Sequence, residues 1–308
     1  MPKVFIVILH YNNEPDTLEC LASLEKISYS DYELVVVDNG SEKESRIMNH
    51  ESRIKGKVIY NEENLGFSGG NNAGIRYALE RGADYVLLLN NDTVVSSDFL
   101  TKLVKAGESD GRFGILGPKI YFYDEPEKLW SAGGKINWLY NKGTMRGYGE
   151  IDRGQYDNHS FQKTDFITGC CLLIKRKVIE KIGLMPEDYF LYYEDTDWSL
   201  KTRRAGFQCI FAPAAKIWHK GSRGSQEGSP SYIYYHTRSG LIFSRRFAPF
   251  YIKPFIHLDI LWRIFKQMIK LIFMPRKRIW ARYILLGIRD FYLGKRGKCG
   301  KGRPLRIT

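Results

Sequence analysis

The chain has 308 residues, enough to bury a sizeable core in one large domain or two. Its apolar and charged fractions, 44% and 26%, are ordinary for a globular protein and exclude a disordered or fibrous one. The net charge of +13 is uneven, because residues 238–308 hold 18 Lys or Arg against two Asp, while residues 1–237 hold 29 basic and 32 acidic side chains.

Apolar runs alternate with helical spacings in the first hundred residues. Residues 4–9, 34–37 and 86–89 are short apolar runs that predict buried strands, and each run is followed by polar residues. The first run is too short and too soon polar for a secretory signal. The alternation predicts a parallel sheet with right-handed crossovers, whose strand ends form a ligand crevice.

The stretch VLLLNNDTVV, residues 86–95, places two amides and a carboxylate at such a strand end. Asp92 could hold a divalent cation there, because Mg²⁺ and Mn²⁺ take oxygen ligands and often use only one or two protein carboxylates. The alternative is that Asn90, Asn91 and Asp92 form only a capped turn.

A glycine-rich stretch, NLGFSGGNNAG at residues 64–74, matches neither a dinucleotide fingerprint nor a P-loop. It predicts a helix beginning near Ser68, whose free N–H groups suit a phosphate or a ribose oxygen. A tight turn that packs the helix on the sheet is the alternative.

Further elements follow in the middle of the chain. Residues 98–106 predict a helix, 114–121 and 166–174 predict strands, and 210–219 predicts two short strands around Pro213. Residues 130–148 are rich in Gly, Lys and aromatics, which is typical of a hairpin or flap over a site. Trp130 and Trp138 could instead belong to an ordered core.

The stretch DYFLYYEDTDWSLKTRRAGF, residues 188–207, concentrates acids and aromatics at the start of a predicted helix. Acids in a first turn are stabilised by the helix dipole, so capping alone could explain Glu194, Asp195 or Asp197. An aromatic wall would also desolvate a carboxylate and raise its proton affinity, as a general base requires. His219 follows an apolar strand; it is either structural or, if folded toward Asp92, a ligand for Mn²⁺ or phosphate.

Residues 221–230 predict a flexible boundary, after which the chain becomes basic and helical. Basic residues interleaved with large apolar ones favour a membrane interface attracted by anionic lipid, over helices docked on the catalytic domain or pairing in a dimer, and over nucleic acid. No run of about 18 uncharged apolar residues occurs, so no membrane span is expected. The five cysteines form no C-x-x-C pair, which favours reduced thiols of a cytosolic protein, and residues 294–306 predict a disordered tail.

Seven motifs stand in an order that resembles a known family. They are VILHYNN, ELVVVDNGS, NLGFSGGNNAGI, LLLNNDT, TGCCLLIKR, FLYYEDTDWSLKTRRAGF and WHKGS, which together span roughly residues 3–222. The chain resembles the inverting GT-A glycosyltransferases of family 2, particularly the rhamnosyltransferase-like branch. The resemblance implies an α/β GT-A fold, with a mostly parallel sheet flanked by helices, and the basic amphipathic helices follow as a C-terminal extension.

The resemblance also implies roles for individual residues. Asp195 matches the catalytic base, and Asn90-Asn91-Asp92 replaces the family's D-x-D motif, a departure that leaves Asp92 as the main carboxylate to the metal. His219 matches a histidine that in some members completes the metal or diphosphate site. The implied nucleotide-sugar residues are Leu9, Tyr11, Asp38, Asn71, Asn90 and Asn91, and those of the acceptor or sugar pocket are Thr168, Gly169 and Glu194.

The implied activity is sugar transfer from a nucleoside-diphosphate sugar, dTDP-rhamnose first and a UDP-hexose next, to a saccharide or lipid-linked acceptor. A divalent metal, Mg²⁺ or Mn²⁺, is the implied cofactor, and nucleic acid is not an expected partner. Expected domains are residues 1–228, with a nucleotide half to about 110, and a membrane-associating extension at 229–308. We expect the protein in the cytoplasm, bound peripherally to the inner face of the cell membrane. The resemblance implies a bacterium that makes surface polysaccharide. Nucleotidyl transfer to a sugar phosphate and a non-catalytic membrane-bound scaffold are the alternatives.

Overall fold

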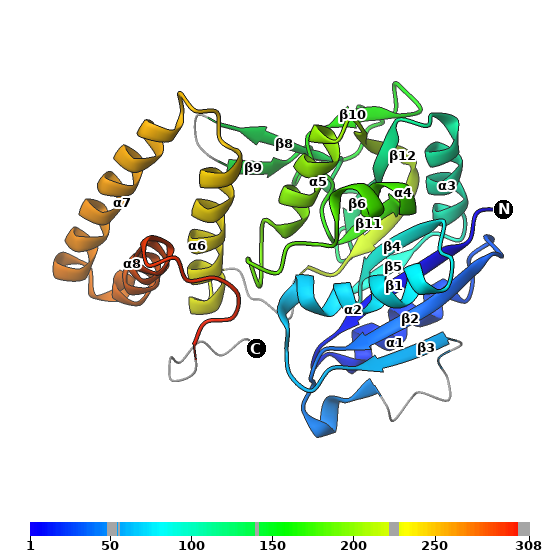
Figure 1. Ribbon diagram of the computed structural model, residues 1–308, viewed down its shortest axis with the longest axis horizontal. Helices are drawn as coiled ribbons and strands as arrows, with labels where there is room; N and C mark the ends of the chain where they lie inside the picture. The colour runs from blue at the N-terminus through cyan, green and yellow to red at the C-terminus, as the bar shows by residue number, and fades with distance from the viewer. Residues whose placement is uncertain (48–53, 55, 139–141, 222–227, 301–308) are drawn as a thin grey trace.

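The computed structural model describes residues 1–47, 54, 56–138, 142–221 and 228–300 (Figure 1). One mixed sheet with helices on both faces forms the larger part of the molecule, and three helices extend from it on one side. The expected α/β architecture with a C-terminal helical extension is therefore confirmed.

One ten-stranded sheet contains most of the described strands. Its order is β10-β12-β6-β11-β4-β1-β2-β3, with β5 paired to β12 and β7 to β6. The strands are β1 (Val4–His10), β2 (Tyr32–Asp38), β3 (Gly56–Tyr60), β4 (Tyr85–Asn90), β5 (Thr93–Val95), β6 (Phe113–Phe122), β7 (Leu129–Ser131), β10 (Gln162–Thr164), β11 (Cys171–Lys175) and β12 (Gln208–His219). Strands β3, β2, β1 and β4 are parallel, as the alternating pattern predicts, and β11 runs antiparallel between β4 and β6.

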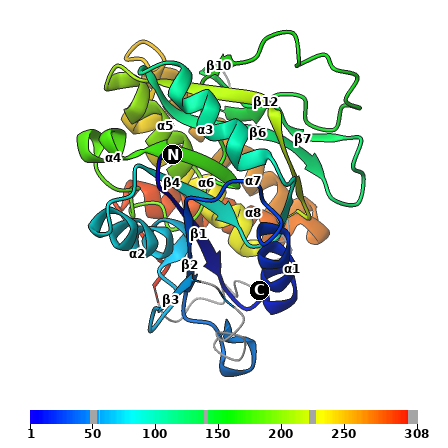
Figure 2. The same cartoon turned by 90° about the vertical axis from the view of Figure 1, so that its right-hand side faces the viewer.

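Two apolar clusters cover the two faces of the sheet. Helices α1 (Glu14–Leu24) and α3 (Phe99–Ser109) pack on one face (Figure 2). Helices α2 (Gly66–Glu80), α4 (Arg176–Ile182) and α5 (Glu194–Arg204) pack on the other. The central strands bury both faces, which explains why β1, β2 and β4 are uninterrupted apolar runs in the sequence.

The predicted flap is a hairpin of β8 (Gly134–Asn137) and β9 (Lys142–Met145). Trp138 at its end stacks on Phe243 of α6 (Pro230–Phe247), with ring centroids 5.8 Å apart. Trp138 is therefore packed against another element, which supports the ordered alternative for this residue.

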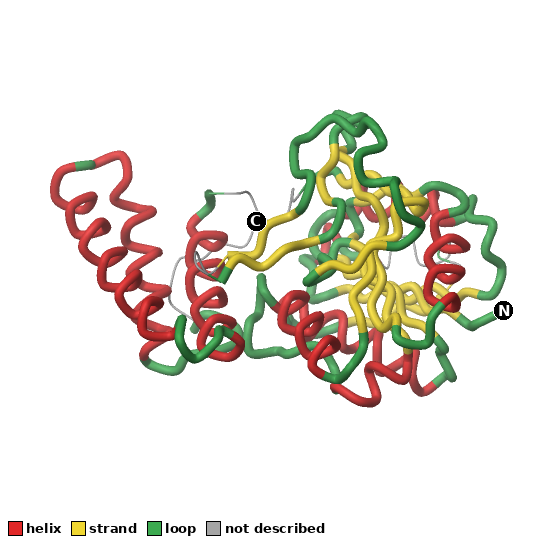
Figure 3. Tube along the Cα trace, turned by 90° about the horizontal axis from the view of Figure 1, so that it is seen from above, coloured by secondary structure: helices red, strands yellow, loops and turns green. Residues whose placement is uncertain are grey.

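Helices α6, α7 (Lys253–Phe273) and α8 (Arg278–Tyr292) form the C-terminal extension. Figure 3 shows that α7 and α8 project away from the sheet, whereas α6 lies between them and the rest of the molecule. Ser229 caps α6, since its side chain accepts a hydrogen bond from the N–H of Tyr232. The boundary predicted at residues 221–230 lies mostly outside the described residues.

Three local predictions are wrong. Residues 208–219 form one strand, not two, because a register shift between Ala212 and Lys216 absorbs Pro213. The strand expected from residue 166 begins only at Cys171, since the residues before it turn toward α5. Residues 294–300, within the expected disordered tail, pack on the molecule, where Gly297 donates a backbone hydrogen bond to Asp188.

Candidate active site

The carboxyl ends of β1, β2 and β4 lie side by side, because β1 pairs in parallel with both neighbours. Leu9 lies opposite Asn90, and His10 lies opposite Asp38. Helix α2 crosses this edge closely, since a Cβ added at Gly70 would lie 2.3 Å from Leu9 Cδ1. Residues expected at the nucleotide therefore gather at the edge where an open α/β sheet binds ligands.

The polar side chains at this edge are partly engaged by backbone. Both carboxylate oxygens of the buried Asp38 accept backbone N–H bonds, including one of 2.9 Å from Ser41. The amide of Asn71 donates to the carbonyl of Phe67 at 2.9 Å. Tyr11 is partly exposed just beyond β1. Asp38 therefore orders the loop after β2, which the sequence did not indicate.

The Asn90-Asn91-Asp92 turn points its side chains in different directions. The amide of Asn91 donates to Thr17 Oγ1 at 2.9 Å and so ties the turn to α1. Asp92 is buried, and its Oδ1 lies 3.1 Å from Nε2 of His219. Two residues 127 positions apart are thus brought together, while Asn91 serves the turn.

His219 is buried at the end of β12, beside β5. The ring of Trp130 meets it edge-on, with centroids 4.7 Å apart. Burial lowers the pKa of His219, but Cys170 and the Asp92 carboxylate oppose that effect, and its pKa is raised well above the usual value. Neither ring nitrogen of His219 has a hydrogen-bond partner of good geometry. Asp92 Oδ1 also has none.

Asp92 Oδ1 and His219 Nε2 face each other and would fit a hard cation when His219 is neutral. Two ligands at right angles and about 2.1 Å from a metal are about 3.0 Å apart, close to the separation of Asp92 Oδ1 and His219 Nε2. Within the described residues no group of three or more His, Cys, Asp or Glu could hold a metal. The chain therefore offers two ligands, and phosphate oxygens and water would supply the rest.

A strained loop precedes α5. Phe190, Tyr192 and Tyr193 all have φ values between 67° and 72°, a left-handed conformation that bulky residues rarely adopt. Phe67, in the first turn of α2, donates its N–H to the carbonyl of Phe190 at 2.8 Å. Strain of this kind persists only where the surroundings impose it, and it is concentrated at functional sites.

Helix α6 imposes this loop conformation from the other side. The buried Arg238 donates to the carbonyl of Tyr189 at 3.1 Å, and Ser239 Oγ donates to the carbonyl of Leu191 at 2.9 Å. The first helix of the C-terminal extension is therefore a structural support of the candidate site. No motif in α6 indicated this role.

Asp195 is held in the first turn of α5. Its Oδ2 accepts the Gly169 N–H at 2.9 Å, and its Oδ1 accepts the N–H and the hydroxyl of Thr196 at 2.6 and 3.0 Å. The side chain stays partly exposed. Burial raises the pKa of Asp195 above its ordinary value, although these hydrogen bonds oppose the effect. The group is thus oriented, reachable and more basic than a free carboxylate.

The segment Gly169-Cys170 connects the two acids. Gly169 donates to Asp195, while the thiol of Cys170 lies beside His219. The carbonyl of Cys170 also accepts the N–H of Asn90, just before Asp92, at 2.9 Å. Asp195 therefore contacts this dipeptide directly, and Asp92 is linked to it through Asn90 and His219. Thr168 is buried directly before it.

The other two acids of α5 differ from Asp195. Glu194 is buried with Oε2 unpartnered, and burial followed by the charge of Asp195 raises its pKa well above the usual value. Asp197 is fully buried and accepts bonds from Tyr189 at 2.7 Å and from Arg246 of α6 at 2.6 Å. Arg246 also binds Asp188 at 2.6 Å, so Asp197 belongs to a clamp between helices.

The sequence is matched by the profile of glycosyl transferase family 2 over residues 5–183. The chain belongs to this family. That match includes β1, β2, α2, the Asn90-Asn91-Asp92 turn and β11, but it ends before α5. The expected family membership is confirmed.

Curated relatives of this family 2 member include transferases of different sugars. It is 31% identical over 202 residues to the low-salt glycan biosynthesis hexosyltransferase Agl10 of Haloferax volcanii, which covers 65% of this chain and 61% of Agl10. It is 25% identical to the dTDP-rhamnosyl transferase RfbF of Shigella flexneri, over 79% of this chain and 80% of RfbF. The chain thus spans less than two thirds of Agl10.

Solved structures of similar fold support the GT-A architecture. The structure of GalNAc-T7 with UDP, GalNAc and Mn²⁺ has a TM-score of 0.62 at 16% identity, covering 95% of this chain and 57% of that one. The mannosyltransferase PcManGT of Pyrobaculum calidifontis, in complex with GDP-Man and Mn²⁺, has a TM-score of 0.57 at 15% identity, covering 96% and 88%. The fold of this family 2 chain is therefore GT-A.

Proposed function

We propose that the protein is an inverting glycosyltransferase that moves a sugar from a nucleoside-diphosphate sugar to a hydroxyl of a saccharide acceptor. The observation that carries this proposal is the connection of Asp92 and Asp195 through the Gly169-Cys170 segment. One acid is paired with a histidine, which suits a cation at a diphosphate, and the other is an oriented base. The two sites are joined by a single dipeptide.

Asp195 performs the proton transfer in this mechanism. Its carboxylate removes the proton from the acceptor hydroxyl as that oxygen attacks the anomeric carbon, and the bond to the nucleoside diphosphate breaks on the opposite side. One displacement of this kind inverts the configuration. The Gly169 and Thr196 donors fix the carboxylate, and the raised pKa of Asp195 favours proton uptake.

Asp92 and His219 are the groups that would hold a divalent cation, Mg²⁺ or Mn²⁺, at the donor diphosphate. Such a cation stabilises the charge that grows on a diphosphate leaving group. Trp130 keeps His219 in place by its edge-on contact, and β5 keeps it beside Asp92. The two neighbours bound with Mn²⁺ support this assignment by fold.

The remaining site residues line the path of the donor. Leu9 and Tyr11 at the end of β1 face the nucleoside in this proposal, together with Asp38 through its loop. Asn71 and Asn90 lie near the nucleotide, and Thr168, Gly169 and Glu194 surround the sugar or acceptor. We favour dTDP-rhamnose as donor, because RfbF is a dTDP-rhamnosyl transferase, with a UDP-hexose next.

The test of this function is a panel of nucleotide sugars with the purified protein. Release of nucleoside diphosphate is measured with Mg²⁺, with Mn²⁺ and with EDTA. We expect release from one donor class, dependent on the metal and inverted in product configuration. A retained product configuration, or nucleotidyl transfer to a sugar phosphate, would contradict the proposal.

We further propose that the extension seats the protein on an anionic membrane surface, facing the cytoplasm. Helices α7 and α8 and their flanks carry 16 exposed large apolar side chains between Phe250 and Leu293, and Trp262 is 55% exposed. Residues 260–289 contain eight Lys or Arg and no Asp or Glu. Exposed apolar surface interleaved with cations fits the interface of anionic lipid.

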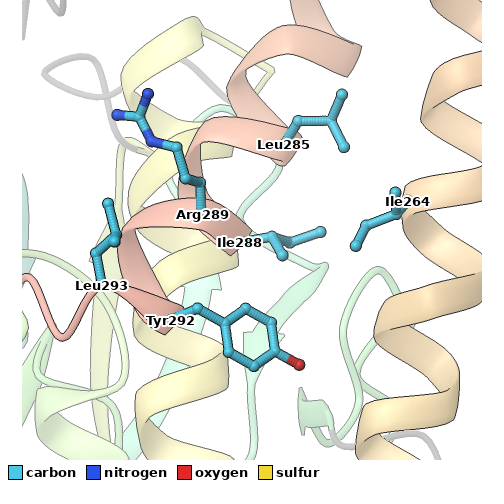
Figure 4. A pocket seen from close by; sticks show the side chains of 6 residues that line it. All are labelled: Ile264, Leu285, Ile288, Arg289, Tyr292 and Leu293. Atoms are coloured by element: carbon cyan, nitrogen blue, oxygen red, sulfur yellow. The ribbon is translucent and has the colours of Figure 1, made fainter.

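The groove between α7 and α8 adds to this apolar surface (Figure 4). It has a volume of about 360 Å³ and is lined by Ile264, Leu285, Ile288, Arg289, Tyr292 and Leu293. Among the described residues no helix is long and apolar enough to cross a bilayer. We propose interfacial binding from the exposed apolar side chains, and a lipid-linked acceptor would suit it.

Vesicle sedimentation tests the membrane proposal. The protein is expected to bind vesicles of anionic phosphatidylglycerol more than those of neutral phosphatidylcholine, and Trp262→Ser with Phe265→Ser is expected to abolish most binding. Tyr148→Ser is the matched control, because Tyr148 is 57% exposed but lies outside the extension. Equal binding of the double variant, or a stable dimer in which α7 is buried, would overturn the proposal.

A further inference from the structure

A second cleft lies at the opposite end of β12 from His219. Its volume is about 370 Å³, and it is formed by the β8–β9 hairpin, β10, the last turn of α5 and the start of β12. The lining residues are Lys135, Arg146, Lys163, Thr164, Asp165, Arg203, Phe207, Gln208 and Cys209. Neither Asp92 nor Asp195 lines it, so it is distinct from the candidate active site.

The cleft has an excess of positive charge. Four of its lining residues are Lys or Arg, and Asp165 is the single carboxylate among them. Asp165 is already engaged, since its Oδ1 lies 2.9 Å from Arg203 Nη1 and its Oδ2 accepts the Ile136 N–H at 2.9 Å. Lys135 and Lys163 are exposed at the rim. No carboxylate of the described residues is paired with the other three cations, Arg146, Lys135 and Lys163.

Arg146 is the most unusual of these cations. Its Nε donates to the carbonyl of Ala132 at 2.7 Å, and its guanidinium lies 5.3 and 5.2 Å from the ring centres of Tyr156 and Phe211. Its Nη2 is buried and has no hydrogen-bond partner. Leaving a buried charged donor unpaired costs free energy that an anion would restore.

Arg146 differs from two lysines whose buried amines pair with carboxylates. The amine of Lys119 lies 2.8 Å from Asp152, and that of Lys220 lies 2.6 Å from Asp16. Arg146 instead has two aromatic rings and a carbonyl around it. A guanidinium held between two rings is suited to binding a phosphate. Because Nη2 is buried, binding requires the Arg146 side chain to turn this nitrogen toward the cleft.

We propose that this cleft binds a phosphate group, held by Arg146 with Lys135 and Lys163 at the rim. Gln208 also lines the cleft, and its buried Oε1 has no partner. A side-chain rotation that brings this oxygen to the cleft would let it accept a hydrogen bond from a ligand hydroxyl. A sugar phosphate combines both features. The phosphate comes either from an acceptor saccharide that carries one or from a free phosphate that regulates the enzyme.

The position of the cleft suits a phosphate that is carried by the acceptor saccharide. Helix α5 carries Asp195 in its first turn and Arg203 in its last, eight residues or about 12 Å along the axis. An acceptor with its reactive hydroxyl at Asp195 would have its phosphate a few sugar units away. The inference that the phosphate belongs to an acceptor rests on the proposed transferase function, whereas phosphate binding itself does not.

Isothermal titration of the full chain with inorganic pyrophosphate and with glucose 1-phosphate, in EDTA, tests the binding. We expect saturable binding that Arg146→Gln weakens about tenfold or more, as for a lost charged hydrogen bond. Lys135→Gln and Lys163→Gln should each weaken it about two- to fivefold, and these exposed positions do not threaten folding. Lys57→Gln, an exposed lysine on β3, is the control.

No saturable binding, or binding that is unchanged in all three cleft variants, would overturn the proposal. Kinetics then distinguish the sources, because an acceptor phosphate predicts a raised KM in Lys163→Gln for phosphate-bearing acceptors alone. A free phosphate predicts instead that glucose 1-phosphate changes the rate with a phosphate-free acceptor, and that Lys163→Gln removes this change. Titration succeeding without any transferase activity would separate this inference from the proposed function.

Discussion

The backbone N–H of Gly169 donates a 2.9 Å hydrogen bond to the carboxylate of Asp195, at the point where the chain also meets His219 through Cys170. A single dipeptide therefore joins the proposed base to the proposed diphosphate site. Most of the expectations that follow depend on this connection.

The pH dependence of turnover should show the environment of Asp195. Burial raises its pKa above the usual value of 3.8, and the base works only when ionised. Activity should therefore rise with pH through this raised pKa and fall as pH drops below it. A profile of kcat/KM against pH is the measurement, and an acid limb at or below 3.8 would contradict the assignment.

Replacing Asp92 with Asn or His219 with Ala should weaken binding of Mn²⁺ in the presence of a nucleoside diphosphate. Each change removes one of two facing ligands. The double variant should therefore lose little more Mn²⁺ affinity than either single variant. Electron paramagnetic resonance of bound Mn²⁺ measures this without turnover. Asp124→Asn, at an exposed carboxylate, is the control, and unchanged affinity in both single variants would remove the pair from the metal site.

The sequence shows the parts of this fold that depend on short-range pattern. The apolar runs of β1, β2 and β4 predict buried strands, and the polar residues after them predict the ligand edge. Pairing across long distances is hidden, because nothing local connects Arg246 with Asp197 or the residues near Gly297 with Asp188.

Backbone conformation is hidden for a related reason. Aromatic residues seldom adopt positive φ, so the sequence around Phe190 and Tyr193 does not predict the left-handed loop. The contacts from Arg238 and Phe67 impose it only after folding. The acids of α5 were correctly placed at a helix start, but only their surroundings separate the oriented Asp195 from the clamped Asp197.

We expect Arg246 to be a positioning residue that lies outside the candidate active site. Its guanidinium spans Asp188 and Asp197, both at 2.6 Å, which the single amine of a lysine cannot reproduce. We expect Arg246→Lys to lower kcat with little change in donor KM. Arg245→Lys, at the exposed neighbour, is the control, and a fall in thermal stability with unchanged kcat would show that Arg246 is only structural.

Glu194→Gln should stabilise the protein near neutral pH. Burial raises the pKa of Glu194 well above 4.5, so the folded state disfavours its ionised form. The wild-type protein therefore loses stability as the pH rises from the pKa of Glu194 in the unfolded state through its higher pKa in the folded state. The Gln variant does not ionise here and keeps this stability. Melting temperatures across pH should diverge above about pH 4.5 in favour of the variant. Parallel curves would contradict the expectation.

The most direct test of the account is the replacement of Asp195 by Asn, measured by donor binding and by turnover with the same preparation. The account predicts unchanged nucleotide-sugar affinity and a kcat lower by about 10²–10⁴-fold, the usual contribution of a positioned base. Asp195→Asn with full turnover, beside an equally active Asp124→Asn control, would contradict it.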